Sequence, residues 1–147
     1  MSRSTDEGQG FTAEERAAMK ERAAELRAAK KGKKSGLEDL LEKIEEMPDA
    51  DRVLAERVHM LVTEAAPHLE PKTWYGQPAY ALDGKVVCFF QAAAKFNTAY
   101  ATFGFNEAQN LMNGGFWVTA FGLEKLTPDA EKQIVELVKK AAGTGTK

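Results

Sequence analysis

One stretch of the chain, residues 72–103, constrains the fold most, because its apolar residues alternate at a period of two. It also holds one of the two tryptophans, all three tyrosines, the only cysteine and four of the eight phenylalanines. Successive side chains of a strand point to opposite faces of a sheet, so this alternation predicts strands. We therefore expect a β-sheet with an aromatic interior to be built from this stretch.

Asp83-Gly84 lies between two apolar runs and predicts a tight β-hairpin. A two-residue type I′ turn needs a positive φ at both central positions, and Asp-Gly is one of the pairs that adopt it. The strand that follows, residues 85–91, is apolar on both faces, which is typical of a central strand. Its first face carries Val86, Cys88 and Phe90.

Two more features complete the expected sheet around this hairpin. Further strands are predicted over residues 97–103 and 116–123, separated by a short helix over residues 106–112. Upstream, an extended segment at residues 73–75 precedes Gly76-Gln77-Pro78. Because a residue before proline avoids the helical region, we expect the chain to break and turn a corner there.

Helices are predicted on both sides of the sheet stretch. Leu37, Leu40, Leu41, Ile44 and Met47 form an amphipathic stripe that predicts a helix over residues 37–47. Helices over residues 49–65 and 128–141 follow from the same periodicity. We expect a two-layer α+β sandwich, in which these three helices pack on one face of an antiparallel sheet of about five strands.

An additional helix over residues 12–31 is predicted to be accessory, because its apolar face is thin. That face consists of Met19, Ala23 and Leu26. The region 11–34 holds eight basic and four acidic residues, but no aromatic residue is interleaved among the lysines, so a solvated helix is favoured over a nucleic-acid-binding arm. The expected organisation is a disordered tail (1–10), an accessory basic helix (11–34), an α+β domain (35–142) and a frayed tail (143–147).

Three segments of the sequence resemble the YdhG-like family of uncharacterised domains. They are Ala65-Ala66-Pro67, Trp74-Tyr75-Gly76-Gln77-Pro78-Ala79-Tyr80 and Asp83-Gly84-Lys85 with its aromatic strand. The resemblance covers roughly residues 37–142. The sequence Thr102-Phe103-Gly104-Phe105 departs from the Tyr-Pro ending of many members. The resemblance implies a non-enzymatic intracellular binding protein, and for some members a frataxin-like iron-chaperone role.

Composition excludes several classes of protein. One cysteine rules out an internal disulfide framework and any zinc site with several cysteines. The sequence shows no secretory leader and no apolar run long enough for a bilayer, so we expect a cytoplasmic protein that does not bind membranes. His59 and His68 have no ligand partners at zinc-site spacing. Cys88 is expected in the core, since no histidine lies near it in sequence. Nothing in the sequence indicates an enzyme.

Acidic residues are concentrated between residues 36 and 70, a region that holds ten acidic and three basic side chains. A solvated helix face is one interpretation. The other is weak, oxygen-ligated cation binding, the chemistry that the frataxin-like resemblance implies for iron. The candidate metal ligands are Glu42, Glu45, Glu46 and Asp49.

The aromatic residues of the sheet stretch suggest a second possible site. As strand residues they are candidates for the core. The alternative is a concave aromatic pocket for a small, including an anionic, molecule, with Lys72, Lys85 or Gln91 at its edge. The candidate ligand-binding residues are Lys72, Trp74, Tyr75, Tyr80, Phe89, Tyr100 and Trp117. In either case we expect a monomer or a weak homodimer.

Overall fold

The structure is a computed structural model that describes residues 11–31, 35–106 and 109–143. In these residues the chain forms four α-helices and five strands, with two short 3-10 helices between strands. The helices are α1 (Ala13–Lys31), α2 (Gly36–Glu45), α3 (Asp49–Ala65) and α4 (Pro128–Ala142). The strands are β2 (Glu70–Trp74), β3 (Gln77–Leu82), β4 (Lys85–Gln91), β5 (Ala101–Phe105) and β6 (Ala120–Leu123). The 3-10 helices are η1 (Ala93–Lys95) and η2 (Gln109–Leu111).

The five strands form one antiparallel sheet in chain order, β2-β3-β4-β5-β6. The Asp83-Gly84 hairpin prediction is confirmed, because β3 pairs with β4 up to Leu82 and Lys85, and both turn residues have positive φ, 53° and 81°. Between Tyr80 and Ala81 the β3–β4 register shifts by a bulge. Such a bulge increases local twist.

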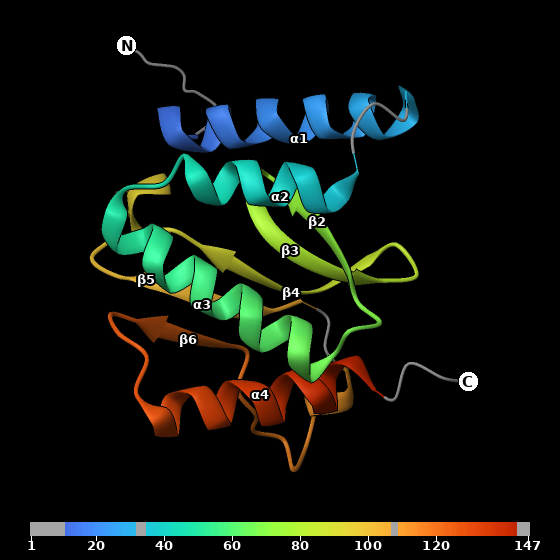
Figure 1. Ribbon diagram of the computed structural model, residues 1–147, viewed down its shortest axis with the longest axis vertical. Coiled ribbons are helices and arrows are strands. Elements are labelled where there is room, and N and C mark those ends of the chain that lie inside the picture. Colours follow the sequence, from blue (N-terminus) through green and yellow to red (C-terminus); the bar gives the residue numbers. More distant parts are fainter. Residues whose placement is uncertain (1–10, 32–34, 107–108, 144–147) are drawn as a thin grey trace.

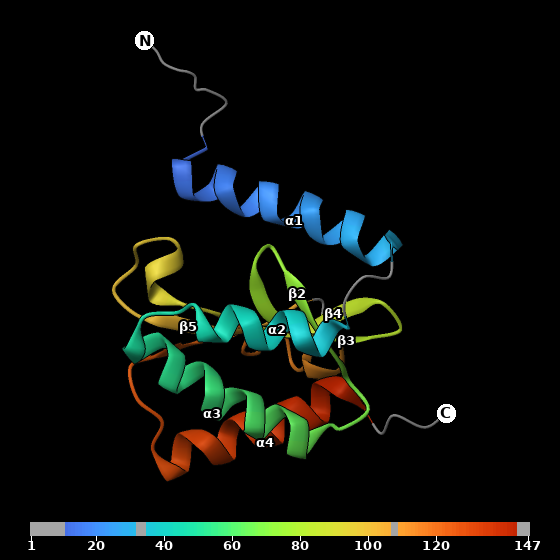
Figure 2. The same cartoon turned by 45° about the horizontal axis from the view of Figure 1, so that its top comes forward.

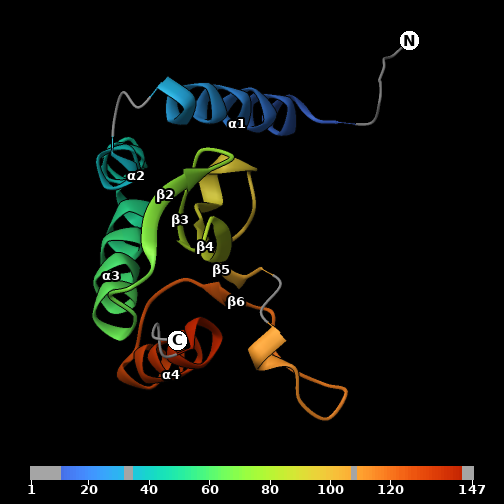
Figure 3. The ribbon, with the colours of Figure 1, turned by 90° about the vertical axis from the view of Figure 1, so that its right-hand side faces the viewer.

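Three helices cover one face of this sheet, as the sequence predicts. Figure 1 shows α3 in front of the strands, with α2 above it and α4 below it, and the side view in Figure 3 places α2 and α3 beside the sheet and α4 next to β6. The α+β sandwich is therefore confirmed. No helix in the described ranges is both long enough and apolar enough to cross a membrane.

The core lies between this helical layer and the sheet. Tyr80, Phe90 and Phe103 are the largest side chains that are fully buried. Phe90 and Phe103 are directly opposite each other in the β4–β5 register, so both project from the same face. Cys88 is also fully buried, and burial raises the pKa of its thiol. Its predicted place in the core is confirmed.

The amphipathic stripe of α2 is buried only in part. Leu40 and Ile44 are in the core, whereas Leu37 and Leu41 are exposed. A Ser35–Glu38 capping box begins the helix one residue earlier than predicted, and the helix ends at Glu45 rather than at residue 47. The predicted helix over residues 49–65 matches α3, and the last helix extends to Ala142.

Helix α1 lies outside the two layers and crosses above the end of the sheet (Figures 2 and 3). The three residues of its thin apolar face, Met19, Ala23 and Leu26, are all exposed. The face toward the domain carries Ala18, Glu21, Arg22 and Glu25 instead. Of these, Ala18 is buried and the others make polar contacts with the sheet and with α2. The helix therefore docks through charge, which apolar periodicity does not detect.

Three predictions about the second half of the sheet need correction. The strand expected at 97–103 is β5, Ala101–Phe105, because residues 97–100 form the turns after η1. The helix expected at 106–112 is reduced to η2, with residues 107–108 outside the described ranges. The strand expected at 116–123 pairs only as β6, at 120–123. The predicted tail at 1–10 lies outside the described residues, as does the predicted tail at 143–147 apart from Gly143, the residue that ends α4.

The corner expected at Gly76-Gln77-Pro78 is instead a second tight hairpin turn. Tyr75 and Gly76 have positive φ, 56° and 76°, and Trp74 pairs with Gln77 across the turn. Pro78 is tolerated inside β3 because the β3–β4 pairing begins one residue later, at Ala79. Its missing N–H therefore removes no bond of that ladder.

The two hairpin glycines give a matched test of what Gly76 contributes. Both have positive φ, so alanine at either site pays the left-handed penalty of about 1–2 kcal/mol. A Cβ at Gly84 would meet nothing within 4 Å, whereas one at Gly76 would clash with the Glu21 carboxylate of α1. We expect Gly76→Ala to lower the free energy of unfolding more than Gly84→Ala.

Urea denaturation of both variants at equal m-value measures this difference. Amide hydrogen exchange in α1 should accelerate in Gly76→Ala and remain as in wild type in Gly84→Ala. Equal losses of stability, with α1 unchanged in both variants, would show that the Glu21 contact contributes nothing.

Candidate functional site

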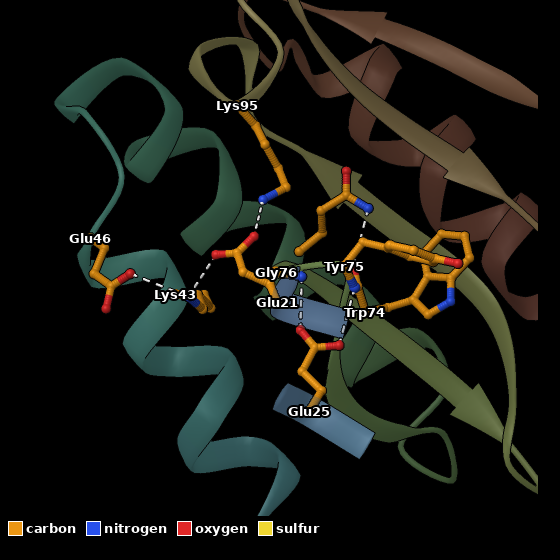
Figure 4. A network of polar contacts seen from close by, with 9 residues as sticks. Glu21, Glu25, Lys43, Glu46, Trp74, Tyr75, Gly76 and Lys95 are labelled. Carbon is orange, nitrogen blue, oxygen red and sulfur yellow. Dashed lines mark hydrogen bonds and ion pairs between the residues drawn. The ribbon is translucent and has the colours of Figure 1, made fainter. Parts of the chain in front are cut away.

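The β2–β3 turn is held by a carboxylate from α1. The backbone N–H groups of Tyr75 and Gly76 both donate to Glu25, at 3.1 and 2.7 Å. Figure 4 shows the two bonds side by side. Consecutive residues in a turn with positive φ aim their N–H groups in one direction, and such concave groups of donors bind anions. Arg22 lies over the Tyr75 ring, 5.9 Å from its centroid, and adds a cation–π contact.

A second carboxylate of α1, one helical turn earlier, lies between two lysines. Glu21 accepts from Lys95 at 2.6 Å and from Lys43 at 3.1 Å, and Lys43 also pairs with Glu46 at 3.6 Å (Figure 4). Partial burial favours a higher pKa for Glu21, but the hydrogen bonds and charges of the lysines outweigh it, so the pKa is lowered. The Glu21 carboxylate therefore stays ionised at lower pH than an ordinary glutamate does.

An aromatic groove of about 370 Å³ lies where α1 overhangs the sheet face that the other helices leave open. Trp74 packs on Phe89, with ring centroids 5.3 Å apart, and on Tyr75 edge-on at 5.1 Å. Gln77 is opposite Trp74 in the β2–β3 register and so shares its face. The aromatic groove is lined by Phe11, Glu15, Ala18, Met19, Trp74, Tyr75, Gln77, Phe89, Gln91 and Phe96.

Gln77 is the polar residue set deepest in this region, with only 4% of its surface exposed. Its Nε2 donates to the Trp74 carbonyl at 3.2 Å. Its Oε1 is buried without a hydrogen-bond partner, the one such side-chain atom in the described part of the chain. An unpaired buried acceptor costs about 1–3 kcal/mol. A ligand donor would relieve that cost.

A smaller cavity of about 180 Å³ lies next to the Glu21 ion pairs. Its charged members are Glu21, Lys43, Glu46 and Lys95, and its apolar wall includes Met47, Pro48, Pro78 and Phe90. Gln77 borders this cavity as well as the aromatic groove. The two cavities are therefore neighbours that meet at Gln77.

Of the seven ligand-binding candidates from the sequence, three line the aromatic groove. These are Trp74, Tyr75 and Phe89. Lys72 instead lines a separate small cavity with Arg22 and Glu25. Tyr100 is 53% exposed and its ring packs on Gly122, while Trp117 is 38% exposed in the loop before β6. The expected single pocket therefore does not form from all seven residues.

Tyr80 faces the helical layer and belongs to the core. Its ring is stacked on that of His59, with centroids 5.8 Å apart, and its hydroxyl hydrogen-bonds His59 Nδ1 at 2.9 Å. This partner satisfies the buried hydroxyl, and burial, with a smaller effect from Cys88, raises the pKa of Tyr80. His59 is only partly exposed, because its ring packs against that of Tyr80.

The four candidate metal ligands of the sequence are exposed on α2 and at the start of α3. Glu46 pairs with Lys43, and Asp49 pairs with Arg52 at 3.0 Å. Glu45 projects to solvent, and Glu42 makes contacts of its own. Within residues 11–31, 35–106 and 109–143, no group of three or more His, Cys, Asp or Glu side chains is placed to hold a metal ion. Iron binding by these four carboxylates thus stays a prediction that rests on the resemblance.

Sequence reasoning missed half of the aromatic groove. Met19 comes from α1, Phe11 lies just before that helix, and Phe96 comes from the segment after η1. None of these belongs to the alternating strands that singled out the aromatic candidates. The sequence did contain one signal for the groove, the alternation of side chains along β4. Phe89 and Gln91 alternate with the buried Phe90, so they had to lie together on the opposite face of the sheet.

No protein-family model, no curated protein and no solved structure matches this chain. The resemblance to the YdhG-like family therefore rests on its three sequence segments alone. The function has to be inferred from the geometry of the site.

The His59–Tyr80 pair makes stability sensitive to mild acid. Burial lowers the pKa of His59 in the folded protein. The unfolded chain, with a histidine pKa near 6.5, then binds a proton more readily, so the free energy of unfolding should fall as the pH decreases below about 6.5. We expect His59→Gln to reduce this fall between neutral pH and mild acid, as measured by urea denaturation at several pH values.

Tyr80→Phe is the control for this titration. It removes the hydrogen bond but leaves the imidazole, so the variant should lose stability at every pH and keep the acid-dependent slope. If the slope of His59→Gln equals that of the wild type, His59 does not titrate differently in the two states.

Proposed function

We propose that this chain is a non-enzymatic ligand-binding domain whose site is the aromatic groove. The ligand class that fits is a small, planar, mostly apolar molecule with one hydrogen-bond donor. The observation that carries the proposal is the open volume against Trp74 and Phe89, about 370 Å³, which is also lined by Gln77, a residue whose buried Oε1 has no hydrogen-bond partner.

The shape of the groove supports binding of a small molecule. Its volume lies within the range of about 300–1,000 Å³ that is typical of ligand sites. Trp74, Tyr75 and Phe89 are only partly buried, so their rings keep surface for a partner. Aromatic rings pair with other rings at centroid distances of about 4.5–7 Å, which makes a flat ligand the natural occupant.

The polar groups of the groove favour an uncharged ligand over the anionic one expected from the sequence. Its lining includes two glutamine amides and the Glu15 carboxylate, and no lysine or arginine. Lys72 and Lys85, expected at the edge, border other cavities. Gln77 Oε1 is an acceptor only, so the ligand has to provide the donor.

Binding rather than catalysis is supported by the chemistry of the lining. The groove residues include no serine, cysteine, lysine or histidine, and so no nucleophile placed beside a base. Cys88 is sealed in the core and its pKa is raised, which keeps it a thiol. Held between rigid strands and a helix, the groove is suited to hold a molecule rather than transform it.

The two tryptophans allow a direct test with 2-naphthol as the probe. Trp74 lines the groove and Trp117 does not. In one NMR spectrum the indole N–H resonance of Trp74 therefore reports on the groove, and that of Trp117 serves as an internal control. We expect 2-naphthol to shift the Trp74 signal saturably and to leave Trp117 unchanged. The matched probe 2-methoxynaphthalene has no donor for Gln77 and should bind several-fold more weakly.

Two alanine variants provide the controls. Phe89→Ala should abolish the shift, because it removes one wall of the groove, whereas Tyr100→Ala should bind as wild type. Equal responses of the two indoles, or unchanged binding by Phe89→Ala, would overturn the proposal.

Calorimetry with ferrous iron under anaerobic conditions separates this proposal from the iron-binding expectation. A variant in which Glu42, Glu45 and Glu46 become Gln and Asp49 becomes Asn should bind 2-naphthol normally. If the wild type shows a saturable heat of iron binding and this variant does not, the result would instead support the role implied by the resemblance.

A further inference from the structure

Helix α1 is attached to the domain in the way that an acidic ligand is bound. Its polar contacts centre on two carboxylates, Glu21 and Glu25, which each receive two hydrogen bonds from the domain. Its larger apolar side chains, Met19 and Leu26, remain exposed. A helix that docks as part of a core buries an apolar stripe. Here recognition is largely electrostatic, with four donors on the domain and one, Arg22, which pairs with Glu25 within α1 itself at 3.4 Å.

Four donor groups of the domain converge on these carboxylates. Two are the N–H groups of Tyr75 and Gly76, whose positive φ values fix their direction independently of α1. The other two are the ammonium groups of Lys43 on α2 and Lys95 on η1, which meet at one carboxylate (Figure 4). Without α1, this arrangement is a preformed anion site with two halves.

We propose that these four donors form a binding site for a small dicarboxylate, and that Glu21 and Glu25 occupy it as internal ligands. One carboxylate of the dicarboxylate would take the turn amides and the other the lysine pair. The lysine half of the site lies outside the lining of the aromatic groove, whereas Tyr75 borders the groove as well.

The spacing of the two halves sets the ligand class. Glu21 and Glu25 lie one helical turn apart on the same face of α1 and reach the two halves of the site, so the ligand class is a dicarboxylate whose acid groups are joined by a short carbon chain. The neighbouring cavity of about 180 Å³ gives room beside the lysine half of the site, where Glu21, Lys43 and Lys95 line it. Gly76 is necessary because any side chain there would clash with the carboxylate between the lysines.

The test uses the full chain with both internal ligands removed. Glu21→Ala/Glu25→Ala empties the site, and alanine preserves the helix because it has the highest helix propensity. Glutarate is the probe, followed through the backbone N–H resonances of Tyr75 and Gly76. We expect saturable shifts in this variant, with an affinity about ten-fold or more above that of the wild type, where the internal carboxylates compete.

Three controls make the result specific. Glu14→Ala removes an exposed charge of α1 and should bind as weakly as wild type. Adding Lys43→Gln/Lys95→Gln to the emptied variant should remove the preference for glutarate over acetate, which has a single acid group. A wild-type-like amide spectrum away from α1 shows that the variants are folded.

Two outcomes would overturn the proposal. One is the absence of saturable Tyr75 and Gly76 shifts in the emptied variant, or an affinity equal to that of the wild type. The other is binding of a peptide with the sequence of residues 13–31 where glutarate does not bind, because the surface would then recognise a helix rather than a small molecule.

Discussion

The hydrogen bonds from the Tyr75-Gly76 turn to Glu25 are the interaction on which the rest of the site depends. A turn with two positive φ values points its N–H groups away from the ladder, so they need an acceptor from elsewhere. Glu25 supplies it, and the absence of a side chain at Gly76 lets Glu21 approach the same turn and reach both lysines. The position of α1, and with it the two cavities that α1 helps to line, follows from these contacts.

Local sequence signals predicted the sheet wherever side-chain alternation and turn chemistry agreed. Asp83-Gly84 met both conditions, and its hairpin formed as expected. Tyr75-Gly76 met neither condition clearly, because tyrosine is uncommon at positive φ and a proline follows closely. The hairpin forms there because Pro78 falls just outside the β3–β4 pairing, and no local pattern reveals that register. The same limit explains why residues 116–119 did not extend β6.

The candidate site was harder to predict, because it depends on two tertiary features: which face of the sheet the helices cover, and where α1 docks. Alternation identifies which strand residues share a face, but it does not show which face the helices will cover. Tyr80 and Phe89 were therefore grouped together, although they lie on opposite faces of the sheet. The polar docking of α1 was equally hidden: charged residues on a helix normally face water, and only the position of their partners on η1 and α2 shows otherwise.

Because α1 belongs to the same chain as the donors that hold it, its two carboxylates are present at a fixed effective concentration, whatever the amount of protein. For short connections that concentration is of millimolar order. Only three residues, 32–34, separate the end of α1 from the residue that caps α2. A molecule that takes the place of Glu21 and Glu25 has to overcome this constant effective concentration of carboxylates. The turn and the lysines would therefore bind abundant metabolites and leave scarce ones unbound.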